Sequence, residues 1–278
     1  MLMGRVDGKV ALVTGAVPGQ GRSHALKLAK EGAAVVAVDV CRPIGGLPYA
    51  TSTPDDLKET ARLVEAAGGR IITSEADVRD YDALVAAVAE GEEAFGPVDV
   101  GVMNAGIFNM VPALEITDDG WRTMLEVNLM GAWHAAKAVA TRLVAAGKPG
   151  SLIFTSSTTG VQAAGLTAHY GASKHGVVGL ARTMAIELGP SNIRCNIIAP
   201  TGVNTTMIMH ETLYRAFHPE MANPTFEDCK PLLEQHHMLP MSHIEPEEVS
   251  NAVLWLASDE SRFVTAALIP VDGGFTQV

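Results

Sequence analysis

The chain has 278 residues, of which 47% are hydrophobic and 18% charged, and its formal net charge is −11. A chain of this size and composition can bury a large core, so we expect a single α/β domain over residues 1–278. The negative charge argues against nucleic acid or an anionic membrane as a partner, because both require clustered lysine and arginine. No segment has the pattern of a signal peptide or a membrane span, which predicts a cytoplasmic protein.

Short apolar runs alternate with longer segments of helical periodicity. The runs predicted as strands are residues 9–14, 33–38, 71–75, 98–103, 152–155, 193–199 and 267–271. Strands that are apolar on both faces and separated by helices predict a parallel sheet covered on both sides, which is a doubly wound fold. The clearest helix runs from about residue 170 to 188, before Gly189 and Pro190 end it.

Two segments interrupt this alternation. Residues 41–56 are rich in Gly, Pro, Thr and Ser, and residues 201–245 carry many His and Met residues. Long loops in a compact domain are usually functional, so we expect an insertion beside a cofactor and a lid loop over the substrate. The methionines favour an adaptable apolar lid, with core packing as the alternative. The histidines of the second segment do not predict a metal site, because the adjacent His236 and His237 would face different directions.

A glycine-rich turn lies directly between the first predicted strand and a helical run. It contains Gly15, Gly19, Gln20 and Gly21. Glycines let the backbone approach a pyrophosphate, whose charge is stabilised by the free N–H groups at a helix N-terminus. The turn therefore predicts dinucleotide binding, although a plain strand–helix turn is the alternative for this motif alone. Pro18 removes one N–H donor, so neighbouring amides must bind the phosphates.

Asp39 stands at the end of the second predicted strand, about 20 residues after the glycine turn. An acid at this place accepts hydrogen bonds from the adenosine ribose hydroxyls. A carboxylate about 4 Å from a 2′-phosphate would cost up to about 4 kcal/mol, or about a thousandfold in affinity. Asp39 therefore favours NAD over NADP, although Arg42 would partly offset the repulsion and a capping or turn role is the alternative.

Two further strand ends carry candidate cofactor residues. Asp77 and Val78 close the third strand, where the adenine ring would lie, and Asp77 is expected to accept a hydrogen bond from its amino group. Asn104, Ala105 and Gly106 close the fourth strand, where small residues and an amide would line the cofactor. For this second group an ordinary strand-ending turn is the alternative.

The residues that carry chemistry follow the fifth strand. Ser157 brings a hydroxyl to the carboxyl edge of the sheet, and Tyr170 and Lys174 follow on the next helix. The spacing of Tyr170 and Lys174 places both side chains on one helix face, where the ammonium can stabilise a phenolate. A phenol with an ordinary pKa of about 10 needs such a cation to exchange protons near neutral pH. The pair therefore predicts Tyr170 as a general acid or base.

The motifs T-G-x-x-x-G-x-G, N-A-G, a serine and Y-x-x-x-K, in this order, resemble those of the short-chain dehydrogenase/reductase family over about residues 8 to 274. The resemblance implies a Rossmann-type sheet of seven strands and hydride transfer between a substrate carbon and the nicotinamide. It implies that Ser157 polarises the substrate oxygen, that Tyr170 exchanges its proton, and that Lys174 also holds the nicotinamide ribose. Asn128 would position Lys174 through water, although taken alone it is a buried structural amide. The resemblance places four more residues at the cofactor: Pro200, Thr201, Val203 and Thr205.

The insertion at 41–56 and the sequence at 200–207 resemble one branch of the family, the mycofactocin-associated, carveol-dehydrogenase-like enzymes. Thr201 departs from the Pro-Gly of most relatives, so the nicotinamide contact is expected to use an altered backbone. The branch implies NAD that is not freely exchangeable and an external redox carrier of mycofactocin type. The long helical segments 121–146 and 170–188 carry more apolar surface than one sheet face needs, and the related family pairs these helices between subunits, so we expect a homotetramer.

The sequence therefore predicts an NAD(H)-dependent oxidoreductase that interconverts a hydrophobic secondary alcohol, carveol-like or steroid-like, and its ketone. Two alternatives use the same fold. One is a catalytically silent dinucleotide sensor, against which the intact Ser157, Tyr170 and Lys174 argue. The other is a lyase or epimerase that uses bound NAD transiently.

Overall fold

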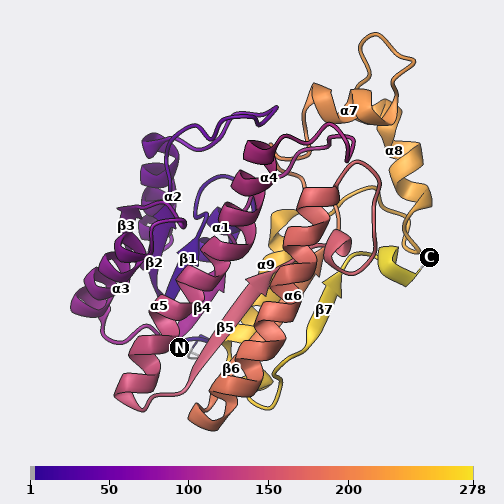
Figure 1. Cartoon of the computed structure of the whole chain (residues 1–278). Coiled ribbons are helices and arrows are strands. Elements are labelled where there is room, and N and C mark those ends of the chain that lie inside the picture. Colours follow the sequence, from indigo (N-terminus) through magenta and orange to yellow (C-terminus); the bar gives the residue numbers. More distant parts are fainter. Residues whose placement is uncertain (1–3, 278) are drawn as a thin grey trace.

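A computed structural model describes residues 4–277 and has a seven-stranded parallel sheet at its centre (Figure 1). The strand order is β3-β2-β1-β4-β5-β6-β7. The strands are β1 (Val10–Thr14), β2 (Ala34–Asp39), β3 (Arg70–Glu75), β4 (Val100–Met103), β5 (Gly150–Thr155), β6 (Ile193–Pro200) and β7 (Leu268–Val271). Every predicted strand is present, and the doubly wound fold is confirmed.

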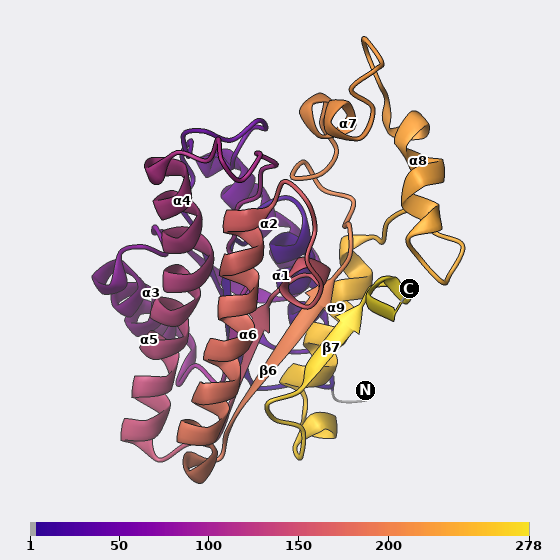
Figure 2. The same ribbon diagram turned by 45° about the vertical axis from the view of Figure 1, so that its right-hand side comes forward.

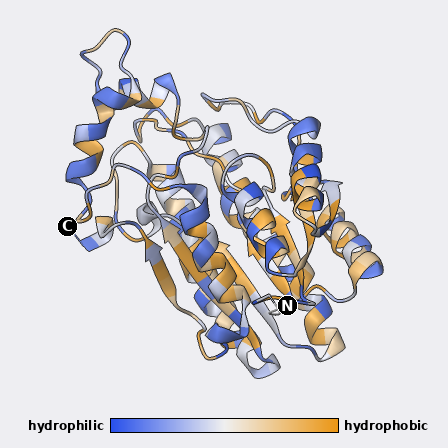
Figure 3. Ribbon diagram, turned by 180° about the vertical axis from the view of Figure 1, so that it is seen from behind, coloured by the Kyte–Doolittle hydropathy of each residue, from blue (hydrophilic) through white to orange (hydrophobic). Residues whose placement is uncertain are grey.

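Helices cover both faces of this sheet (Figures 2 and 3). Their bounds are α1 (Gln20–Lys30), α2 (Pro54–Ala66), α3 (Tyr81–Phe95), α4 (Asp118–Leu125), α5 (Gly131–Ala146), α6 (Ala168–Leu188), α7 (Glu211–Phe217), α8 (Phe226–Gln235) and α9 (Pro246–Ala257). Helices α3, α5 and α6 pack on one face and share one apolar core, whereas α1, α2 and α9 share the other. In the part of the chain described, no helix is long and apolar enough to cross a membrane.

The sheet reverses its winding between β1 and β4. Strand β1 pairs with β2 on one side and with β4 on the other, so the crossovers diverge at this point. Diverging crossovers leave a crevice at the carboxyl ends of the strands, which is where doubly wound folds bind ligands. Most of the predicted cofactor residues follow these strand ends.

The two irregular segments differ in detail from their predicted form. Residues 54–56 belong to the first turn of α2, because Thr53 and Asp56 form a capping box and Pro54 suits the first helical position. The predicted lid loop contains the helices α7 and α8. Thr225 and Asp228 form another capping box at α8. Both helices project from the body of the fold near the C-terminal end (Figures 1 and 2).

Candidate active site

The glycine turn adopts a conformation that requires its glycines. Gly19 has a φ of 110°, in the region that side chains disfavour, and a Cβ on Gly21 would lie 1.8 Å from the carbonyl oxygen of Gly15. Gly19 is also the N-cap of α1 and provides no side-chain cap. The Arg22 N–H donates to the Val17 carbonyl at 3.1 Å, but no side chain caps the N–H groups before it, which are left available to an anion, as the sequence predicted for a pyrophosphate.

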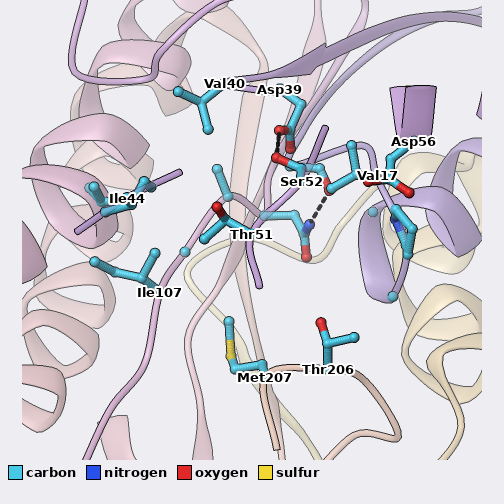
Figure 4. Close-up of a pocket in the computed structure, with 18 of the residues that line it drawn as sticks. Val17, Asp39, Val40, Ile44, Thr51, Ser52, Asp56, Ile107, Thr206 and Met207 are labelled. Carbon is cyan, nitrogen blue, oxygen red and sulfur yellow. Dashed lines mark hydrogen bonds between the residues drawn. The ribbon is translucent and has the colours of Figure 1, made fainter. Parts of the chain in front are cut away.

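Asp39 ends the neighbouring strand β2, whose Val38 carbonyl accepts the Ala16 N–H of the glycine turn, and 6% of its surface is exposed. Its Oδ1 accepts hydrogen bonds from the Cys41 N–H, at 2.9 Å, and from the Ser52 hydroxyl (Figure 4). Burial raises the pKa of Asp39, and the hydrogen bonds from Ser52 and Cys41 oppose that shift. Two residues near the ends of the insertion, Cys41 and Ser52, thus bind the carboxylate that is predicted to bind the ribose. Ser52 was not singled out from the sequence.

Asp77 is already engaged by two arginines. The Arg79 guanidinium contacts both carboxylate oxygens, with Nη2 2.7 Å from Oδ2, and Arg42 Nη2 lies 2.9 Å from Oδ2. Burial opposes ionisation of Asp77, but the hydrogen bonds from Arg79 and Arg42 outweigh it and lower the pKa to about 2. Asp77 therefore remains a carboxylate, and any hydrogen bond to adenine would be added to these ion pairs. Arg42, which was expected to act beside Asp39, pairs with Asp77.

One cavity runs along this edge of the sheet. Eleven predicted cofactor residues line it: Gly15, Gly19, Gln20, Gly21, Asp39, Asp77, Val78, Asn104, Ala105, Gly106 and Thr205. The insertion adds Ile44, Tyr49, Thr51 and Ser52 to its wall, and the lid segment adds Thr206 and Met207 (Figure 4). Five predicted cofactor residues do not line this cavity: Tyr170, Lys174, Pro200, Thr201 and Val203.

Lys174 and Tyr170 lie together at the adjoining catalytic end, both buried. Lys174 Nζ is 5.7 Å from the centroid of the Tyr170 ring and donates a hydrogen bond to the Thr155 carbonyl at 2.9 Å. Burial raises the pKa of Tyr170 to about 12, against a smaller opposite effect of the Ser157 hydroxyl, and lowers the pKa of Lys174 to about 8. The predicted lowering of the Tyr170 pKa by Lys174 is therefore not found, because desolvation dominates both groups.

Asn128 connects the sheet edge to the catalytic helix. Its Oδ1 accepts the Ile107 N–H at 2.8 Å, and its Nδ2 donates to the Ile107 carbonyl at 2.9 Å and to Ser173 Oγ at 3.1 Å. Ser173 in turn donates to the Tyr170 carbonyl at 2.7 Å. A Cβ on Gly106 would lie 3.3 Å from Asn128 Oδ1 and 3.4 Å from Lys174 Nζ, so the N-A-G segment packs closely against both of these side chains.

Ser173 is a further residue that sequence reasoning missed. Its signal was a serine inside a helix, three residues after Tyr170, where a hydroxyl can bond back to a carbonyl of the preceding turn.

Thr201 is held from the lid segment. Its hydroxyl lies 2.9 Å from His237 Nε2, and His237 Nδ1 lies 2.8 Å from the Leu233 carbonyl. Because that carbonyl only accepts, Nδ1 carries the ring proton of the neutral imidazole and Nε2 accepts from Thr201. His237 thus has a structural partner at each nitrogen.

The cavity suits a dinucleotide by three features: an open helix N-terminus, a glycine whose Cβ would collide with the backbone, and a buried carboxylate at the end of β2. The first two fit a diphosphate and the third fits a ribose diol. Tyr170 and Lys174, the predicted catalytic pair, lie beyond Gly106, next to the other end of the cavity.

Known proteins share this architecture. A family model described as enoyl-(acyl carrier protein) reductase matches residues 15–276. The (-)-trans-carveol dehydrogenase of Rhodococcus erythropolis is 46% identical over 276 residues, which cover 99% of each chain. The crystal structure of carveol dehydrogenase from Mycobacterium avium in complex with NAD is 48% identical, with a TM-score of 0.96, and the match covers 98% of this chain and 99% of that one. A short chain dehydrogenase from Mycobacterium paratuberculosis bound to NAD is 42% identical, with a TM-score of 0.91 and coverage of 99% and 100%.

This chain belongs to the short-chain dehydrogenase/reductase family and is an oxidoreductase of that family. The predicted resemblance to its carveol-dehydrogenase-like branch is confirmed by these relatives.

Replacing Asp39 with asparagine is expected to weaken the discrimination between NAD and NADP. The Asp39→Asn variant keeps a hydrogen-bonding side chain but removes the charge that repels a 2′-phosphate. We expect relative NADP affinity to rise by about 10-fold to 1000-fold, the upper end being the full Coulomb cost. Calorimetric titration with each dinucleotide measures this, on protein freed of bound cofactor by unfolding and refolding. Asp55→Asn, which removes an exposed carboxylate from the same part of the chain, is the matched control. An unchanged cofactor preference in Asp39→Asn would show that another group distinguishes the ribose hydroxyl from the 2′-phosphate.

Proposed function

We propose that the protein is an NAD(H)-dependent dehydrogenase that interconverts a hydrophobic secondary alcohol and its ketone. The observation that carries this is the buried Tyr170 and Lys174 beside Ser157, next to a cavity that fits a dinucleotide. Terpenoid alcohols of the carveol kind are the substrate class we favour, because the relatives named above include carveol dehydrogenases. Apolar cavity residues such as Ile44, Ile107 and Met207 support a hydrophobic substrate.

The roles follow from the chemistry of the residues. A bound NAD supplies the carbon that accepts or returns hydride. Tyr170 gives its proton to the ketone oxygen or takes it from the alcohol, and Ser157 orients that oxygen. Lys174 contacts the ribose and affects the Tyr170 proton, while Asn128 and Ser173 hold the helix that carries both. Pro200, Thr201, Val203 and Thr205 complete the nicotinamide end.

Tyr170→Phe is expected to lower turnover of carveol-like alcohols by at least about 100-fold, because general acid–base catalysis by a positioned group is worth about 10² to 10⁴. NADH binding should remain nearly unchanged, since only the oxygen is lost. Lys174→Ala should weaken both turnover and binding. Single-turnover absorbance and NADH fluorescence measure the two quantities. Retention of most of the activity by Tyr170→Phe would contradict the assignment of the proton donor.

We propose further that NAD is held without free exchange and is reoxidised by an external carrier of mycofactocin type. The insertion is tied down along its length, which supports this. The Ser52 hydroxyl and the Cys41 N–H bind Asp39, the Thr51 hydroxyl binds the Arg42 carbonyl at 3.2 Å, and Asn109 Nδ2 lies 3.4 Å from the Gly46 carbonyl. A segment fixed in this way raises the barrier to cofactor release, and tight binding is usually achieved through slow release.

NAD or NADH is therefore expected to co-purify and to survive extensive dialysis. Turnover with free NAD alone should be slow, and deleting residues 44–52 should accelerate the release of labelled NAD by at least about tenfold, because related binding sites differ mainly in their dissociation rates. Comparing the release rates of the intact and shortened proteins tests this. Equal and rapid release from both would show that the insertion does not retain the cofactor.

We also propose a homotetramer that pairs α4, α5 and α6 between subunits. The outer surface of these helices carries an apolar groove, lined by Leu125, Leu129, Met130, Trp133 and Leu180. Trp121 and Trp133 are about 40% exposed on this face, and Ile186 is 78% exposed. Exposed apolar surface of this extent on adjacent helices is typical of an interface.

Light scattering at micromolar concentration is expected to give the mass of a tetramer. Trp133→Arg, which places a charge in the groove, should shift the population to smaller species. A monomer in the unmodified protein would refute the proposed pairing.

A further inference from the structure

Tyr49 belongs to the insertion but extends to the catalytic end of the cavity. Its hydroxyl oxygen accepts a hydrogen bond from the Phe108 N–H at 3.0 Å. The Phe108 ring packs edge-on against the ring of Tyr170, with centroids 4.8 Å apart. Tyr49 also lines the cavity described above. The insertion therefore places the Tyr49 phenol near Tyr170, the predicted proton donor, and Phe108 contacts both residues.

The Tyr49 hydroxyl is available to donate a hydrogen bond to a ligand. The Phe108 N–H occupies the oxygen as an acceptor, and within residues 4–277 no acceptor for the Tyr49 O–H is found. Burial raises the pKa of Tyr49 well above its ordinary value, while the Phe108 N–H has the opposite effect and the nearby Tyr170 adds to the rise. The group therefore stays protonated, as a hydrogen-bond donor.

The Tyr49 ring is fixed from two sides. The His210 ring of the lid segment packs against it with centroids 5.5 Å apart, while the Phe108 N–H fixes its oxygen. A donor held in this way loses little conformational freedom when a ligand binds, so a hydrogen bond to it contributes more to affinity than one to a mobile side chain.

We propose that Tyr49 is a specificity-determining residue that donates a hydrogen bond to a second oxygen of the substrate, a carbonyl or hydroxyl remote from the carbon that reacts. This rests on the proposed dehydrogenase function. Tyr49 contacts the segment that packs on Tyr170, whereas the buried acid and the glycine turn that suit the dinucleotide's adenosine and diphosphate lie elsewhere along the cavity. This narrows the proposed substrate class to terpenoid-like alcohols that carry one oxygen more than carveol, whose one oxygen is the reacting hydroxyl.

The apolar surroundings make this donor selective. Ile44, Ile107 and Met207 line the same cavity (Figure 4). A substrate that places carbon against the Tyr49 hydroxyl strips water from it without replacing the hydrogen bond, and leaving a buried donor unpaired is costly. A substrate oxygen at that place avoids the penalty.

Two pairs of isosteric alcohols test the proposal: 4-hydroxycyclohexanone against 4-methylenecyclohexanol, and 3-hydroxycyclohexanone against 3-methylenecyclohexanol. Each pair differs only in an oxygen or a methylene group. Stopped-flow reduction of the bound cofactor gives the relative kcat/KM for the intact protein and for Tyr49→Phe. Tyr214→Phe is the matched control, because it removes a lid hydroxyl whose one hydrogen bond within residues 4–277 goes to Met209 Sδ, at 3.7 Å.

The intact protein is expected to prefer the oxygen-bearing member of at least one pair by about tenfold or more. Tyr49→Phe should lose this preference, because the hydrogen bond to the oxygen-bearing member and the penalty on the methylene analogue disappear together, and Tyr214→Phe should keep it. No preference in the intact protein, or the same preference in Tyr49→Phe, overturns the role of Tyr49. An equal fall in kcat/KM for both members of a pair in Tyr49→Phe also overturns this role, because Tyr49 would then act on cofactor binding or on the fold. If no alcohol reduces the cofactor of the intact protein, the proposed function itself fails.

Discussion

The arrangement of the catalytic end depends on one buried amide, that of Asn128, which is 1% exposed. It pairs with both the N–H and the carbonyl of Ile107, just beyond β4, and with Ser173 on α6. Leaving any of these groups unpaired in the core would cost about 1–3 kcal/mol, so the amide holds the helix and the sheet edge at a fixed separation. The helix around Asn128 widens into a π-turn at Glu126–Met130, a distortion that is common at functional sites.

Because that separation is fixed, Tyr170 and Lys174 are held where water has little access. Burial disfavours the charged form of each group, and it therefore acts in opposite directions on the two pKa values. The tyrosine keeps its proton and the lysine is less strongly cationic than an exposed one. Such a pair is prepared to donate a proton to a ketone oxygen. In the opposite direction, loss of the phenol proton requires additional positive charge nearby, which an oxidised nicotinamide would bring.

The sequence was most informative where a local pattern determines the structure. Apolar runs predicted all seven strands, and the glycine turn and Asp39 predicted residues that line the cavity, because each pattern depends on residues close together in the chain. The Tyr170–Lys174 spacing likewise predicted two side chains that lie together, buried, next to the cavity. The helices α7 and α8 were missed because neither carries a long apolar periodicity. Helix α7 has 7 residues, and α8 contains Pro231, a residue that is typical of loops and helix ends.

Contacts between distant segments were not predictable in the same way. The bond from Ser52 to Asp39 closes a loop, and the bond from Phe108 to Tyr49 joins two loops that are not neighbours in the chain. Neither serine nor tyrosine has a distinctive spacing that marks it as functional. The pairing of Asp77 with Arg42 also required knowledge of how the insertion folds back over the sheet.

The insertion contacts both ends of the cavity, and substrate specificity is therefore coupled to cofactor binding. At one end Ser52 binds Asp39, the carboxylate predicted to bind the ribose, and at the other Tyr49 binds the segment that packs on Tyr170. Only two residues, Ala50 and Thr51, separate Tyr49 from Ser52 along the chain, so movement of one contact displaces the other. Opening the segment to release the cofactor would therefore also remove the Tyr49 hydroxyl from the substrate end. A substrate that binds Tyr49 stabilises the closed form by its differential affinity for that form. Cofactor retention and substrate recognition then depend on the same equilibrium, that between the open and closed forms of the insertion.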